Sequence, residues 1–202
     1  MLKKINEKRR LTICIVCLSL FAYTLSVVFS TQINALDSII IYRNEFMSSV
    51  FKIITCFGNW YTIVIITLLS LFLKNKKYFK YITLNAIVIT FTNQMLKIII
   101  HRPRPDINNR IINALGYSYP SGHAMISTAF YGFIFYLVWK SNLKMCYKII
   151  INSLIVILII SICFSRVYLG VHYLTDVIAG SSLSMIYLCI YTYLLNKKKV
   201  WE

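Results

Sequence analysis

The sequence contains little proline, little glycine and few acidic residues: 3 prolines, 6 glycines and 6 aspartates or glutamates occur among 202 residues. It has no linker-like stretch, no low-complexity segment and no internal repeat, which are the usual marks of several domains or of a repeat array. Two of the three prolines, Pro103 and Pro105, lie in a single loop. We therefore expect one domain that covers residues 1–202.

The cysteines give no sign of a disulfide framework. Most of the six lie inside apolar runs, where a thiol behaves as a small hydrophobic group. Cys14 and Cys17 have the spacing of a redox pair, but they lie within a predicted membrane span and no βαβ pattern surrounds them. The sequence therefore indicates neither a disulfide scaffold nor a redox site.

Apolar residues, in contrast, are abundant. They make up 58% of the chain, and the mean hydropathy is +0.69. A helix that crosses the roughly 30 Å core of a bilayer needs about 20 such residues in a row. The sequence therefore predicts an all-α membrane protein with six transmembrane helices in a bundle. The predicted spans are about 11–30, 53–73, 81–100, 123–139, 149–165 and 173–195.

The first apolar run and the segment that follows it need separate interpretations. The first run follows a basic start and could be a signal peptide, but it is long for one and residues 31–34 offer no small-residue cleavage site. Residues 31–52 mix Asp37, Arg43 and Glu45 with isoleucines. This mixture predicts a short amphipathic helix at the membrane interface, between the first and second spans.

The net charge of +16 fits either a nucleic-acid partner or the excess of basic residues found in cytoplasmic loops. Threading the spans from a cytoplasmic N-terminus places 15 of the 22 basic residues inside, spread over short loops and not gathered with aromatic residues. We therefore predict a cell-membrane protein with both termini in the cytoplasm and no nucleic-acid partner. The 15 are Lys3, Lys4, Lys8, Arg9, Arg10, Lys74, Lys76, Lys77, Lys80, Lys140, Lys144, Lys148, Lys197, Lys198 and Lys199.

The other seven basic residues lie on the outer side and need another explanation. Among them, Lys97 stands near the end of the third span, where its ammonium can reach the interface. Pro103 and Pro105 end that helix and hold Arg104 in extended backbone. The seven are Arg43, Lys52, Lys97, Arg102, Arg104, Arg110 and Arg166.

A second polar cluster begins the fourth span. Pro120 and Ser121 are ordinary helix-start residues, but they leave His123 unexplained. The helix N-terminus at Gly122 offers free backbone N–H groups and a partial positive charge, which suit a phosphate or another oxyanion.

The third cluster joins the last two spans. Arg166 directly follows the fifth span, at the mouth of the outer loop. The spacing of four between His172 and Asp176 predicts one helical face on which the carboxylate holds the imidazole. The other ring nitrogen then keeps a lone pair and can act as nucleophile or base. All three clusters lie on the outer side, so we expect an anion site with histidine chemistry, and phosphoryl transfer is the reaction that this set favours.

These residues resemble the three-part signature of the type 2 phosphatidic acid phosphatase superfamily. Lys97 to Pro105 has the form K-x6-R-P, Pro120 to His123 reads P-S-G-H, and Ser165 to Asp176 has the form S-R-x5-H-x3-D. Nothing in the signature is missing. The integral-membrane members of this family have six helices, which extends the resemblance over most of the chain.

The resemblance implies a role for each matching residue. His172 would attack phosphorus and become a phosphohistidine, Asp176 would orient it, and His123 would protonate the leaving oxygen and then activate water. The phosphoryl oxygens would be held by Lys97, Arg104, Ser121, Gly122 and Arg166. No metal ion or other cofactor is implied, and only Asp106 and Asp176 lie near the motifs as carboxylates.

The predicted function is therefore a metal-independent lipid phosphatase at the outer membrane face. Its substrate would be a polyprenyl diphosphate such as undecaprenyl diphosphate, phosphatidate or phosphatidylglycerophosphate, and the motifs do not separate these. Two alternatives stay open: a phosphotransferase that passes the phosphoryl group to an acceptor other than water, and a membrane protein that binds lipids without catalysis. A vanadate haloperoxidase is disfavoured because its relatives are soluble. The oligomeric state is not indicated.

Overall fold

A computed structural model describes residues 2–29, 43–73 and 75–200, with side chains from residue 7 onward. Within these ranges the chain is helical and contains no strand, so the all-α prediction is confirmed. The helices are α1 (Leu2–Phe29), α2 (Glu45–Cys56), α3 (Trp60–Leu69), α4 (Lys77–Ile100), α5 (Gly122–Lys140), α6 (Met145–Tyr168) and α7 (Leu174–Lys197), with the short 3-10 helices η2 (Ser70–Phe72) and η3 (Ile107–Asn109).

Five helices of the described chain are long and apolar enough to cross a membrane: α1, α4, α5, α6 and α7. The pair of α2 with α3 and η2 passes the same test only as one unit, bent by 48°. The six-span count is therefore met when this bent pair is taken as one span. Within the predicted span 53–73 the helix is interrupted, because α2 stops at Cys56 and α3 begins at Trp60. Of the predicted interfacial helix, residues 31–42 lie outside the described ranges, and residues 45–52 form the first two turns of α2.

The break between α2 and α3 centres on Gly58, which packs against the start of α5. A Cβ at this position would lie 2.9 Å from His123 Cδ2 and 3.0 Å from Ser127 Oγ, so a larger residue would require these side chains to shift. Two side chains satisfy carbonyls that the break releases: Thr62 Oγ1 donates to the Cys56 carbonyl and Tyr131 Oη to the Phe57 carbonyl, both at 2.7 Å. Within an apolar layer, backbone that leaves the helix needs such partners.

Helix α5 is the centre of the bundle and packs against α4, α6 and α7. Its Met125, Phe130 and Phe133 are fully buried. A glycine lets α7 approach the N-terminus of α5 closely: a Cβ at Gly180 would lie 2.8 Å from the Ser121 carbonyl oxygen. The backbone N–H of Ser121 also donates to the Asp176 carbonyl at 3.0 Å. The first turns of α5 and α7 are therefore in direct contact.

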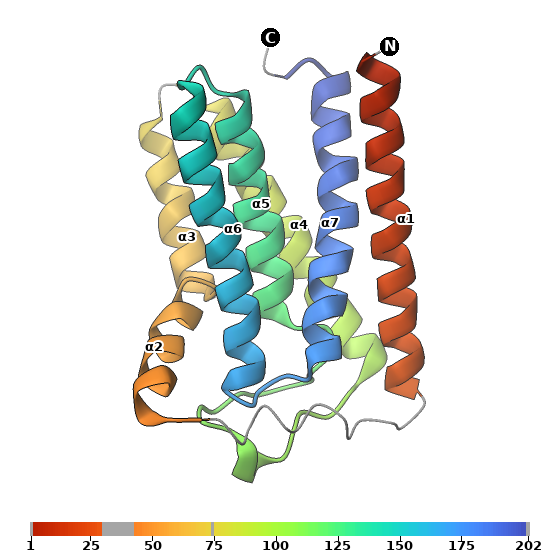
Figure 1. The fold of residues 1–202 in the computed structure, drawn as a ribbon, viewed down its shortest axis with the longest axis vertical. Helices are drawn as coiled ribbons and strands as arrows, with labels where there is room; N and C mark the ends of the chain where they lie inside the picture. The colour runs from red at the N-terminus through yellow and green to blue at the C-terminus, as the bar shows by residue number, and fades with distance from the viewer. Residues whose placement is uncertain (1, 30–42, 74, 201–202) are drawn as a thin grey trace.

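The two ends of the bundle hold different parts of the chain. Both termini lie at one end, and the α4–α5 and α6–α7 connections lie at the other, next to α2 (Figure 1). At this second end α4 stops at His101, whose left-handed backbone (φ 51°) caps the helix before Pro103. Helix α1 packs along α7, and its Thr24 hydroxyl lies 3.0 Å from the Tyr119 hydroxyl in the α4–α5 loop. The three sequence motifs thus meet at the end opposite to the termini.

Candidate active site

His172 lies in the turn between α6 and α7 and is almost entirely buried, with 3% of its surface exposed. Its Nδ1 is 3.4 Å from Asp176 Oδ2 and 3.3 Å from Ser118 Oγ. Its Nε2 is 3.1 Å from Arg104 Nη1. Because the carboxylate favours the proton on Nδ1, Nε2 carries the lone pair and accepts from Arg104.

The predicted geometry of this pair is wrong in one respect. His172 and Asp176 do not share a helical face, because α7 begins only at Leu174 and His172 precedes it. Asp176 stands at the third helical position, where Oδ2 accepts from the Tyr173 backbone N–H at 2.9 Å. The carboxylate therefore caps α7 while it faces the imidazole, an arrangement typical of helix N-termini.

Two further side chains, neither of which belongs to the three sequence motifs as site residues, hold the Asp176 carboxylate. Arg102 forms a buried ion pair with Oδ1 through Nη1, which also donates to Thr175 Oγ1 at 2.8 Å. Its guanidinium lies over the Tyr173 ring, 4.2 Å from the centroid. Ser118 donates to Oδ2 through a short hydrogen bond. Asp176 is fully buried, so its negative charge depends on these donors.

The ionisation of two groups outside the spans follows from burial. Burial lowers the pKa of His172 from 6.5 to about 3, against the opposing effect of Asp176. Its imidazole is therefore neutral at pH 7 and has the free lone pair that a nucleophile requires. Burial, and then the nearby Arg110, also lower the pKa of Arg104, although a guanidinium stays charged at neutral pH.

His123 occupies the first turn of α5 and faces the break between α2 and α3. Its Nε2 lies 2.7 Å from Asn59 Oδ1, in the segment where Gly58 approaches the ring. Asn59 also donates to the Tyr61 hydroxyl at 2.5 Å, which orients its amide with the oxygen toward the histidine. Asn59 is a third residue that could not be predicted from the sequence, because it belongs to no motif and lies 64 residues from its partner.

The three predicted cations reach the same region from three elements. Lys97, in the last turn of α4, donates to the Tyr117 carbonyl at 2.6 Å and lies 3.4 Å from that of Ser118. Arg104, in the loop, donates to the carbonyls of Gly116, Leu115 and Val171 at 3.0, 2.9 and 2.8 Å. These contacts fix the loop around His172 and use most of the donors of Arg104.

Arg166 differs from Lys97 and Arg104 because one of its buried N–H groups has no hydrogen-bond partner among the described residues. It is 4% exposed, in the last turn of α6, and donates through Nη1 to Thr55 Oγ1 at 2.6 Å. The unpaired group is its Nε. A buried, unpaired N–H is costly, so Arg166 is the cation best prepared to bind an incoming anion.

Ser121 and Gly122 stand at the N-terminus of α5. Ser121 has the N-cap position, but its side chain makes no capping hydrogen bond, and its buried Oγ has no partner among the described residues. Gly122 begins the helix, where backbone N–H groups point outward. Both residues therefore retain donors at the point where a helix favours negative charge.

A cavity of about 620 Å³ joins these elements. Ser121 and Asp176 do not line it; Asp176 lies behind His172. Six predicted site residues do line it: Lys97, Arg104, Gly122, His123, Arg166 and His172. Within the described ranges no group of three or more His, Cys, Asp or Glu side chains could hold a metal ion. The cavity can receive an anion between three cations and offers it a neutral imidazole nitrogen.

Comparison with known proteins gives a family match and two curated relatives. A family model described as the PAP2 superfamily matches residues 77–200, which include every predicted site residue. Phosphatidylglycerophosphatase B of Bacillus subtilis (strain 168) is 39% identical over 100 residues, 46% of this chain and 46% of that protein. Dolichyldiphosphatase of Saccharomyces cerevisiae is 34% identical over 116 residues, 52% of this chain and 46% of that protein. The chain thus spans about half the length of these relatives.

Two solved structures share the fold. A transmembrane PAP2-type phosphatidylglycerolphosphate phosphatase from Bacillus subtilis matches with a TM-score of 0.77 and 27% identity, over 90% of this chain and 96% of that one. LpxE of Aquifex aeolicus matches with a TM-score of 0.65 and 21% identity, over 79% of this chain and 92% of that one. The first match supports a multi-pass membrane protein, and the second concerns the fold alone.

Proposed function

The chain belongs to the PAP2 superfamily, and from this premise we propose that it is a lipid phosphatase in which His172 is the nucleophile. The observation that carries the proposal is the position of His172 Nε2, a neutral nitrogen in a cavity lined by Lys97, Arg104 and Arg166. A lone pair beside three cations suits attack on the phosphorus of a phosphoester.

In the first step Nε2 of His172 attacks phosphorus, the bond to the leaving oxygen breaks, and a phosphohistidine forms. His123 donates a proton to the leaving oxygen. In the second step His123 takes a proton from water, the water oxygen attacks phosphorus, and the P–N bond breaks to release phosphate. Asp176 keeps the His172 proton on Nδ1 and stabilises the positive charge that develops on the ring.

The phosphoryl oxygens are bound by Lys97, Arg104 and Arg166, together with Ser121 and Gly122 at the N-terminus of α5. The unpaired Nε of Arg166 and the unpaired hydroxyl of Ser121 support this assignment. The three positive charges face oxygens that are most anionic in the transition state, so they lower the barrier as well as bind substrate. They perform the neutralisation that metal ions supply in other phosphoryl-transfer enzymes, and we propose a reaction that needs none.

The substrate class follows from the relatives, whose names include a phosphatidylglycerophosphatase and a dolichyldiphosphatase. We propose a membrane lipid with a terminal phosphate or diphosphate: a polyprenyl diphosphate, phosphatidate or phosphatidylglycerophosphate. The active site faces the outer side of the membrane and both termini face the cytoplasm. The 15 basic residues assigned to the cytoplasmic side, against seven outside, support this orientation.

The test is release of free phosphate by the purified protein in detergent, over a panel of lipid monophosphates and diphosphates. We expect turnover of at least one class and its loss in His172→Ala. A stable phosphoryl adduct on wild-type protein that transfers to an added alcohol faster than to water would instead identify a phosphotransferase. Turnover that is equal in wild type and His172→Ala would contradict the assignment of the nucleophile.

A further inference from the structure

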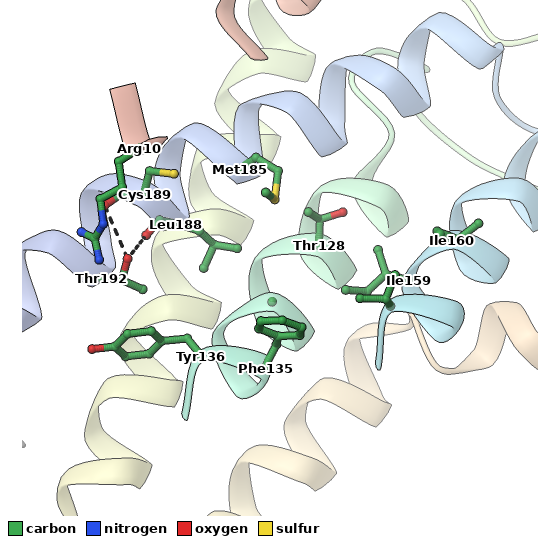
Figure 2. A pocket seen from close by; sticks show the side chains of 12 residues that line it. Arg10, Thr128, Phe135, Tyr136, Ile159, Ile160, Met185, Leu188, Cys189 and Thr192 are labelled. Atoms are coloured by element: carbon green, nitrogen blue, oxygen red, sulfur yellow. Dashed lines mark hydrogen bonds between the residues drawn. The ribbon is translucent and has the colours of Figure 1, made fainter. Parts of the chain in front are cut away.

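A second cavity is lined by other residues than the catalytic cavity, and His172 is not among them. The proposed reaction does not use this second cavity. It measures about 420 Å³ and is formed by α5, α6 and α7, with Arg10 of α1 at one end (Figure 2). Its size is within the range of small-ligand sites. Ile160 and Met185 line it and are 62% and 38% exposed, so the cavity opens as a groove on the membrane-facing side of the bundle.

The groove has one polar end, and the rest of its lining is apolar except for Thr128. Figure 2 shows Arg10, Tyr136 and Thr192 at one end, and Ile159 and Ile160 at the other. The Thr192 hydroxyl donates to the Leu188 carbonyl and the Tyr136 hydroxyl to Asn196 Oδ1, both at 2.7 Å. These hydroxyls therefore have partners inside the protein, and the guanidinium of Arg10 dominates the polarity of this end.

Arg10 is half-buried, and no described residue forms an ion pair or a hydrogen bond with it. Its surroundings at this end of the bundle are basic. Glu7 is the one acidic residue among the described residues near the termini, against basic side chains on α1, on the C-terminal turn of α7 and beside the α5–α6 connection. These are Lys8, Arg9, Lys140, Lys144, Lys148, Lys197, Lys198 and Lys199.

Charge complementarity and the membrane setting together identify the occupant. We propose that the groove binds an anionic diacyl phospholipid, with the phosphate on Arg10 and one acyl chain along the apolar wall of α5, α6 and α7. From Met185 to Thr192 the groove follows α7 for about 10 Å, at a rise of roughly 1.5 Å per residue, which is room for part of an acyl chain. Basic pockets between membrane helices bind anionic headgroups in this way.

A second copy of the chain is a poorer occupant. In the same membrane orientation it would bring its own basic end beside this one, and like charges would repel. An uncharged or zwitterionic lipid would fill the apolar wall equally well, but it would leave the charge of Arg10 without a counter-charge. The proposal therefore requires selectivity for the anionic headgroup and not only retention of a lipid.

The test uses the purified full-length protein, freed of lipid and then mixed with phosphatidylglycerol or phosphatidylcholine that carries the same acyl chains. Native mass spectrometry measures the lipid retained. We expect selective retention of phosphatidylglycerol, and a loss of about fivefold in its affinity in Arg10→Gln, the usual contribution of one interfacial arginine. Arg9→Gln is the matched control, because Arg9 is exposed and does not line the groove.

A second pair of variants tests the acyl-chain wall. Ile160→Trp should fill the groove and reduce retention of both lipids, whereas Leu154→Trp, an equally exposed position of α6 outside the groove, should not. Arg104→Ala should leave retention unchanged, because the catalytic cavity is separate. Equal retention of the two lipids, or equal losses in Arg10→Gln and Arg9→Gln, would overturn the proposal. So would a lipid-free dimer that Ile160→Trp dissociates, since a second copy would then occupy the groove.

Discussion

Replacing Arg102 tests whether the support of Asp176 matters as much as Asp176 itself. Arg102 does not line the catalytic cavity, so it makes no contact that a substrate there would replace. Its guanidinium pairs with Asp176 Oδ1, and both side chains are buried, at 3% and 0% exposure. We predict that Arg102→Gln lowers kcat and leaves KM nearly unchanged, because the variant loosens the carboxylate that aligns His172.

The magnitude follows from the donors around Asp176. Without Arg102, Oδ1 has no donor among the described residues, while Oδ2 keeps Ser118, the Tyr173 N–H and His172. Removing one partner of a buried ion pair costs about 3–5 kcal/mol of stability. A lost charge-assisted hydrogen bond of about 1.5–3 kcal/mol corresponds to a decrease in kcat of roughly 10- to 100-fold, if its full effect is felt in the transition state.

The assay is phosphate release, with kcat and KM fitted separately, alongside thermal unfolding of the same samples. Arg110→Gln is the matched control, since this substitution removes a charge from the same loop. Among the described residues, Arg110 donates only to the Pro105 and Ala114 carbonyls. Arg102→Lys should recover part of kcat, because it restores the charge. A kcat within twofold of wild type in folded Arg102→Gln, or an equal decrease in Arg110→Gln, would refute the reasoning.

Three further predictions concern the histidines and their carboxylate. Asp176→Asn should lower kcat at least as much as Arg102→Gln in the same assay, because it removes the orienting charge; a smaller loss would contradict that role. His123→Ala should lose about 10²- to 10⁴-fold in the first-turnover burst with an alkyl monophosphate, whose leaving oxygen needs a proton, and much less with a diphosphate or nitrophenyl phosphate; equal losses would make His123 a binding residue. Because the pKa of His172 falls from 6.5 to about 3 on folding, the unfolded state binds more protons between these values and the free energy of unfolding decreases as pH falls through 6.5. This effect is about 2 kcal/mol between pH 7 and pH 5, so thermal unfolding of His172→Gln should depend less on pH than that of wild type, and parallel pH profiles would count against a neutral buried His172.

The sequence predicted the helical class because apolar runs of about 20 residues have few other physical explanations. It did not predict the break between α2 and α3. Residues 53–73 read as one apolar run, whereas at the break Gly58 packs against His123 and Ser127, residues far away in the chain. A local pattern carries no information about such a contact.

In the candidate site, too, some residues could be predicted from the sequence and others could not. Lys97, Arg104 and His172 could be identified because charged groups at membrane depth are unusual and because their spacing resembles a known signature. Arg102 was noted as an unexplained basic residue, but its ion pair with Asp176 joins positions 74 residues apart. Ser118 and Asn59 gave no signal at all, since neutral polar residues in loops are common. The pairing of His172 with Asp176 was predicted, although through a helix that in fact begins after His172.

The hydrogen bond from the Ser121 N–H to the Asp176 carbonyl has a consequence for how this fold tolerates change. It joins the backbone at the start of α5, two residues before His123, to the backbone of α7, four residues after His172, so a main-chain contact helps to set the offset between the two histidine-bearing segments. Substitutions on the membrane-facing surfaces of both helices should therefore leave the spacing between His123 and His172 largely unchanged.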